Sequence, residues 1–156
     1  MKTKLLAVCA AVAMSVCAPA QAQAPIEIQW WHSMSAALGD WVNDLAKQYN
    51  ASQSQYKVVP TYKGQYDESM TGAIAAFRAG NAPHILQVFE VGTATMMASK
   101  GAIVPAAKVL NDAGFKFEPT EYVSAVAGYY TAPNGQMLSY PLNSSTTIFY
   151  LSLIHI

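Results

Sequence analysis

The sequence has little cysteine, no excess of charge of either sign, and no apolar run long enough to cross a membrane as a helix. Its 156 residues include two cysteines, and lysine plus arginine number nine, as do aspartate plus glutamate. This balance leaves no basic footprint for nucleic acid. The apolar run over residues 5–18 is shorter than the roughly 20 residues of a membrane-spanning helix, which makes a retained membrane anchor the weaker interpretation. Hydrophobic residues make up 53% of the chain, which suits one globular domain with a real core.

The first 22 residues have the pattern of a cleavable secretory signal peptide. Lys2 and Lys4 precede the apolar run, and Ala20-Gln21-Ala22 supplies an A-x-A cleavage site. Removal of residues 1–22 leaves seven basic and nine acidic side chains, a net charge of −2, and no thiol. An exported chain without thiols cannot form a disulfide and must depend on packing. We therefore expect a soluble protein of the periplasm or of another extracytoplasmic compartment.

Signatures of catalysis and of metal or cofactor binding are missing from the sequence. It contains no G-x-S-x-G elbow, no G-x-x-x-x-G-K-[ST] loop, no G-x-G-x-x-G motif and no H-E-x-x-H motif. The histidines His32, His84 and His155 are scattered, so a zinc site would need carboxylates from several segments. His32 and Ser33 are neighbours at the end of a predicted strand and point to opposite faces, so a nucleophile–base pair is not expected. The sequence predicts no enzyme, no catalytic residue, no metal site and no cofactor.

Hydrophobic periodicity predicts alternating strands and helices before Gly101. Apolar runs and alternation indicate the strands, and apolar residues at helical spacing indicate the helices. This order favours an α/β fold with a largely parallel sheet and right-handed crossover helices. Pro60, near the end of the second strand, favours an edge position for that strand. The predicted strands cover residues 26–31, 56–62 and 85–89, and the helices cover residues 36–49, the stretch between a cap at Asp67 and a stop at Gly80, and residues 93–100.

The helix predicted over residues 36–49 has an apolar stripe that we expect to face the core. Ser33 or Ser35 is expected to cap its first turn, and Asn50 is expected to close it. The stripe consists of Leu38, Trp41, Val42, Leu45 and Tyr49.

Beyond Gly101 the periodicity weakens and shorter elements are predicted. The turn residues Pro133-Asn134-Gly135 separate two helical stretches from two short strands. No internal repeat, low-complexity tract or linker supports a domain boundary within this region. The predicted helices cover residues 105–113 and, after Pro119, residues 121–127, and the predicted strands cover residues 136–141 and 147–150.

Polar side chains stand where the predicted strands end. The segment "APHILQVFE" contains an apolar run, interpreted as a strand covered on both faces, that stops at Glu90. Because open α/β sheets bind ligands at the carboxyl ends of their strands, these side chains predict a binding rim for a small hydroxylated molecule. A solvated or capping role for a single glutamate is the alternative. The rim consists of His32, Ser33, Tyr66 and Glu90, together with Ser144 or Ser145.

Four motifs resemble those of a known family. They are W-H-S-M at residues 31–34, Y-K-G-Q-Y at 62–66, Q-V-F-E-V-G-T-A-T-M-M-A-S-K at 87–100 and Y-P-L-N-S-S-T at 140–146. Together they closely resemble the extracellular solute-binding family of ABC importers, which includes the maltose-binding type, and within it the glycerol-3-phosphate-binding members. The resemblance covers nearly all of the chain after the signal peptide, and in combination the motifs are more specific than any single short one.

The resemblance implies a type II periplasmic-binding-protein-like α/β fold, whose two lobes close around a solute. Residues 23–150 would form most of the N-terminal lobe, and residues 151–156, which depart from the family pattern, would be a non-native or truncated tail. The implied solute is glycerol 3-phosphate or its diesters. The implied partner is an ABC permease in the inner membrane, and a monomer that binds no nucleic acid is expected. The implied ligand contacts are Tyr66, Glu90 and Ser145, with Ser144, His32 and Ser33 as secondary candidates from the rim.

The three implied contact residues differ in the hydrogen bonds that they can make. A carboxylate repels a phosphate dianion, so Glu90 is expected to accept hydrogen bonds from the glycerol hydroxyls, each worth roughly 1.5–3 kcal/mol. Tyr66 and Ser145 can donate and are expected at the phosphate. Two alternatives stay open, a binding protein for a neutral sugar or oligosaccharide and, from another class, an extracytoplasmic phosphodiester hydrolase.

Overall fold

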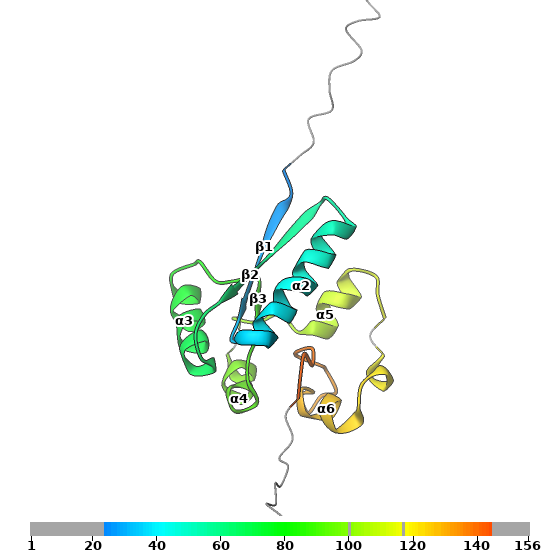
Figure 1. Ribbon diagram of the computed structural model, residues 1–156. Coiled ribbons are helices and arrows are strands. Elements are labelled where there is room, and N and C mark those ends of the chain that lie inside the picture. Colours follow the sequence, from blue (N-terminus) through cyan, green and yellow to red (C-terminus); the bar gives the residue numbers. More distant parts are fainter. Residues whose placement is uncertain (1–23, 100, 117, 145–156) are drawn as a thin grey trace, which may run out of the picture.

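The computed structural model describes residues 24–99, 101–116 and 118–144, which form a mixed α/β fold around an open three-stranded sheet (Figure 1). All strand pairs in this sheet are parallel, in the order β2-β1-β3. The predicted α/β class with a largely parallel sheet is therefore confirmed. The strands are β1 (Ile26–His32), β2 (Tyr56–Tyr62) and β3 (Ile85–Leu86).

Strand β1 is the centre of the sheet and makes most of its strand contacts with β2. All seven residues of β1 pair with β2 in parallel register. On its other side, Trp30 and Trp31 of β1 pair with β3. Strand β2 is an edge strand of the described sheet, as Pro60 predicted, because proline has no N–H to donate to a further strand.

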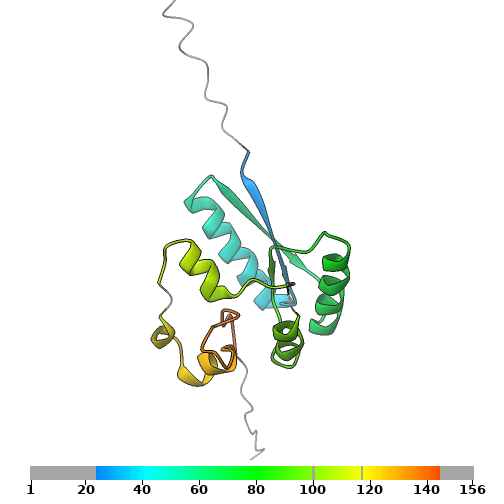
Figure 2. The ribbon, with the colours of Figure 1, turned by 180° about the vertical axis from the view of Figure 1, so that it is seen from behind.

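The two crossover helices cover opposite faces of the sheet. Helix α2 (Ala36–Ser52) leads from β1 to β2, and helix α3 (Tyr66–Arg78) leads from β2 past β1 to β3. Because these connections run in opposite directions across the sheet, right-handed crossovers place the helices on opposite faces, as Figures 1 and 2 show. The carboxyl edge of the sheet is thereby divided into an α2 side and an α3 side.

Helix α2 buries less of its apolar stripe than predicted. Val42 and Ala46 are buried, and their small side chains let the helix approach the sheet closely. A sheet of three strands is too narrow to cover larger side chains on either side of this line of contact. The prediction that the whole stripe faces the core is therefore wrong for four exposed residues, Leu38, Trp41, Leu45 and Tyr49.

The ends of α2 and α3 differ in detail from the predicted ones. Ser35 occupies the N-cap position of α2 but makes no side-chain capping hydrogen bond. Helix α2 continues beyond Asn50, because the side-chain amide of that residue binds the main-chain N–H and carbonyl of Val58 on β2. Gln65 rather than Asp67 is the N-cap of α3, and Asp67 lies in the first turn, where a carboxylate interacts favourably with the helix dipole.

The segment around Glu90 departs most from prediction. The strand predicted over residues 85–89 pairs over only 2 residues, and Ile85 is 45% exposed rather than covered on both faces. Helix α4 (Glu90–Ala98) starts at Glu90, with Phe89 as its N-cap, and not near Thr93 as predicted. An acidic residue is favourable in the first turn of a helix, which accounts for the earlier start. Glu90 is thus the first residue of a helix and not the last residue of a strand.

The second half of the described chain is held by main-chain hydrogen bonds and short helices. In the first turn of α5 (Ala106–Asp112), main-chain N–H groups donate to the carbonyls of Met137 and Leu138, and Met137 is 2% exposed. The strand predicted over residues 136–141 is reduced to one antiparallel bridge between Thr131 and Met137, and the strand predicted over residues 147–150 lies outside the described residues. The helices predicted over residues 105–113 and 121–127 correspond to α5 (Ala106–Asp112) and, after the 3-10 turn η1 (Pro119–Glu121), to α6 (Ser124–Tyr129).

Within the described ranges, no helix has the length and apolar character needed to cross a membrane. In the same ranges, histidine, cysteine, aspartate and glutamate form no group of three or more that could hold a metal ion. The predicted signal peptide over residues 1–22 and the predicted tail over residues 151–156 lie outside the part of the chain that the structure describes.

Candidate binding site at the carboxyl edge of the sheet

A glycine turn and a returning carboxylate place Tyr66 at the carboxyl edge. After β2 the chain turns at Gly64, whose φ of +83° lies in the left-handed region. A Cβ at this position would overlap the Glu68 carboxylate, which turns back to accept a hydrogen bond from the Gln65 main-chain N–H at 2.8 Å. Tyr66 follows as the first residue of α3. The Y-K-G-Q-Y motif therefore sets the start of the helix and the position of its second tyrosine.

The starts of α3 and α4 meet where Tyr66 stacks on Phe89, the residue before Glu90. The Tyr66 ring stacks on that of Phe89, with 5.3 Å between the centroids and 21° between the planes. Gly92 permits this approach, since a Cβ there would stand 2.8 Å from the Met70 sulfur. Tyr66 and Glu90 are both half-buried. The structure thus brings together the two main predicted contact residues that it describes, while their role in binding remains a prediction.

Two tyrosines that the sequence analysis did not single out join these residues. The Tyr129 hydroxyl donates to the main-chain carbonyl of Glu90 at 2.6 Å, and the rings of Tyr129 and Tyr130 meet edge to face with centroids 5.2 Å apart. Tyr130 is 8% exposed. Its pKa is raised, first by burial and then by the charges of Glu90, Tyr129 and Tyr66, so its phenol stays protonated at neutral pH. We call Tyr66, Phe89, Glu90, Tyr129 and Tyr130 the Glu90 group.

Gln87 links the end of β1 to the segment that contains the predicted serine contacts. Its side-chain carbonyl accepts a hydrogen bond from the Ser33 main-chain N–H at 3.0 Å, and its amide donates to the Asn143 side-chain oxygen at 3.4 Å. The Ser33 hydroxyl is buried and has no hydrogen-bond partner in the described ranges. Ser144 is exposed, and Ser145 lies outside the described residues. Ser33 and the start of the N-S-S-T segment therefore lie close together at this edge.

His32 lies on the α2 side of the sheet and is 3% exposed. Its ring contacts those of Trp30 and Tyr62, with centroid distances of 6.0 and 6.2 Å. Burial lowers the pKa of His32 because it disfavours the charged imidazolium, while the Met34 backbone acts weakly in the opposite direction. The ring is therefore neutral at neutral pH.

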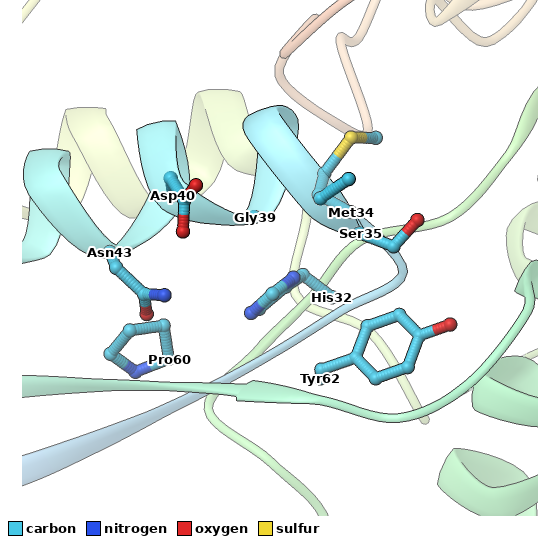
Figure 3. Close-up of a pocket in the computed structure, with 9 residues that line it drawn as sticks. His32, Met34, Ser35, Gly39, Asp40, Asn43, Pro60 and Tyr62 are labelled. Atoms are coloured by element: carbon cyan, nitrogen blue, oxygen red, sulfur yellow. The ribbon is translucent and has the colours of Figure 1, made fainter.

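A pocket of about 340 Å³ lies beside His32. Figure 3 shows the His32 ring between α2, which carries Asp40 and Asn43, and β2, which carries Pro60 and Tyr62. The residues that line this pocket do not include Tyr66 or Glu90, so the structure does not join His32 to the Glu90 group. We call it the His32 pocket, lined by His32, Met34, Ser35, Ala36, Gly39, Asp40, Asn43, Pro60 and Tyr62.

The parallel sheet and the polar side chains at its carboxyl edge are consistent with part of a periplasmic-binding-protein-like lobe. Proteins of similar sequence indicate the class of protein more specifically. A protein of Yersinia enterocolitica is 54% identical over 140 residues, and proteins of Brucella abortus and Rhizobium meliloti are 52% and 51% identical over 130 residues. Each is named sn-glycerol-3-phosphate-binding periplasmic protein UgpB.

The aligned segments cover 83–89% of this chain but only 30–32% of each relative, so the chain spans about a third of their length. No protein-family model matches the chain. The resemblance predicted from the four motifs is confirmed by these relatives, whose names describe binding proteins of the periplasm and not enzymes.

Proposed function

We propose that this chain is part of a periplasmic solute-binding protein that binds sn-glycerol 3-phosphate and delivers it to an ABC permease of the inner membrane. The observation that carries the proposal is the 51–54% identity to relatives named for this solute. In the proposal, residues 1–22 are a signal peptide that directs export, and residues 23–150 form most of one lobe.

The Glu90 group has the chemistry that recognition of glycerol needs. The Glu90 carboxylate is acceptor-only when ionised, so it suits the hydroxyl groups of a polyol and disfavours a phosphate dianion beside it. The Tyr66 phenol can donate a hydrogen bond to a phosphate oxygen, and we assign Ser145 the same role. The neutral glycerol part and the anionic phosphate group of the solute would then contact different places on the same lobe.

One lobe supplies only one wall of such a site. Tyr66 and Glu90 are half-buried, which leaves them accessible to a ligand. A second wall would come from the part of the relatives that this chain does not span, and closure of the two walls would exclude water and strengthen each charged hydrogen bond. We therefore expect strong binding only by the full-length protein. We expect that protein to be a monomer.

A hybrid protein tests the proposal. The matched segment of this chain replaces the corresponding 32% of the Yersinia enterocolitica relative, and the unaltered relative is the positive control. We expect isothermal titration calorimetry to show that the hybrid binds glycerol 3-phosphate and prefers it to maltose. A hybrid that folds but prefers maltose contradicts the solute assignment.

The proposal contains no catalytic step. The same hybrid is incubated with glycerophosphodiesters, and release of glycerol 3-phosphate is followed over time. Binding without turnover is expected, whereas turnover above that of buffer contradicts the assignment as a binding protein.

A further inference from the structure

The start of α4 is held from a distant part of the chain. The hydrogen bond from the Tyr129 hydroxyl to the Glu90 carbonyl joins residues 39 positions apart. The N-cap Phe89 offers no side-chain hydrogen bond to the first turn of this helix. Figures 1 and 2 show α4 and α6 at the end of the molecule toward which the strands run. The orientation of Glu90 therefore depends on Tyr129 and on the stacking of Tyr66 with Phe89.

We propose that Tyr129 is a positioning residue for Glu90, which makes the end of α6 part of the solute site. This inference rests on the proposed function. It extends the site to a segment for which neither the motifs nor the names of the relatives assign a role.

The two tyrosines have different tasks. Tyr129 acts on the main chain of Glu90 and so fixes the direction of the carboxylate without touching the solute. Tyr130 is buried, and its ring packs edge to face against that of Tyr129, so it helps to hold the Tyr129 ring in place.

The test compares two anions in the hybrid protein, glycerol 3-phosphate and inorganic phosphate. Tyr129→Phe keeps the ring and removes one neutral hydrogen bond, so its dissociation constant for glycerol 3-phosphate should rise about three- to tenfold. The dissociation constant for inorganic phosphate, which has no glycerol hydroxyls, should be unchanged.

Tyr140→Phe is the matched control, because the Tyr140 hydroxyl also donates to a main-chain carbonyl, that of Ala106, at 3.4 Å. It should leave both dissociation constants unchanged. In the double variant Tyr129→Phe with Glu90→Gln, the loss should not exceed that of Glu90→Gln alone, because Tyr129 acts through Glu90.

The outcomes separate this inference from the proposed function. An unaltered hybrid that binds neither anion contradicts the proposed function and the inference together. If the hybrid binds glycerol 3-phosphate, but Tyr129→Phe leaves both dissociation constants unchanged or raises both by the same factor, then only the inference is wrong.

Discussion

The Glu90 group and the His32 pocket each contain at least one tyrosine and a carboxylate, but they are built differently. The His32 pocket is formed by β1, α2 and β2, which follow one another along the chain. The Glu90 group combines the starts of α3 and α4 with the end of α6, and a hydrogen bond across 39 positions fastens it. The order β2-β1-β3 explains this, because it sends the two crossovers to opposite faces.

Two predicted site residues at the same edge of the sheet thus differ in burial and in what holds them. Buried neutral His32 packs against Trp30 and Tyr62, as a core residue does. Glu90 is half-buried, and its backbone is held in place by a side chain from another segment. We therefore propose that His32 serves the packing of the α2 side and that Glu90 serves recognition.

The largest expected effect comes from comparing the carboxylate of the Glu90 group with that of the His32 pocket. In the hybrid protein, Glu90→Gln removes the charged acceptor and should weaken binding of glycerol 3-phosphate at least tenfold, since about 1.4 kcal/mol corresponds to one decade. Asp40→Asn removes the carboxylate of the His32 pocket and should change the dissociation constant less than about twofold. Titration calorimetry measures both, and the reverse ranking would move the site to the α2 side.

A smaller effect is expected on the packing that brings Glu90 to Tyr66. Gly92→Ala places a Cβ 2.8 Å from both the Met70 sulfur and the Phe89 ring, so the free energy of unfolding of this chain should fall by about 1–3 kcal/mol. Gly72→Ala on α3 is the control, because a Cβ there meets no atom within 4 Å. It should raise stability by up to about 1 kcal/mol. Urea unfolding measures both, and equal effects would refute the close approach of α4 to α3.

The smallest effect concerns pH and the α2 side. The pKa of folded His32 lies below its ordinary 6.5, so protonation favours the unfolded chain. The contribution of His32 to stability is complete above about pH 6.5 and is lost as the pH falls through its folded pKa. His32→Phe keeps an aromatic ring but cannot be protonated, so its urea midpoint should fall less between pH 7.5 and 5.5. A midpoint that falls equally in both proteins contradicts the burial of a neutral His32.

Local patterns in the sequence were sufficient for most of the fold before Gly101. Strand β2 has the predicted bounds because its apolar residues alternate between turn signals, and Pro60 indicated its edge position. The burial of α2 could not be predicted from its periodicity, because the width of the sheet decides which apolar residues are covered. The start of α4 was missed because an apolar run before a glutamate does not show where pairing stops.

The candidate site was predictable only in part. Tyr66 follows β2 and Glu90 follows β3, and the carboxyl ends of these parallel strands lie at the same edge of the sheet, so the place of both residues at that edge follows from the topology. Tyr129 and Tyr130 were missed because nothing local shows that α6 contacts α4. Their one signal in the sequence is a pair of tyrosines at the end of a helical stretch, a residue type that joins an apolar ring to a polar tip.

Amide hydrogen exchange of the hybrid protein, with and without saturating glycerol 3-phosphate, tests most directly which side of the sheet binds the solute. We predict that the ligand slows exchange in the first turns of α3 and α4 and leaves the first turn of α2 unchanged. Slower exchange confined to the first turn of α2, around the His32 pocket, would contradict the account.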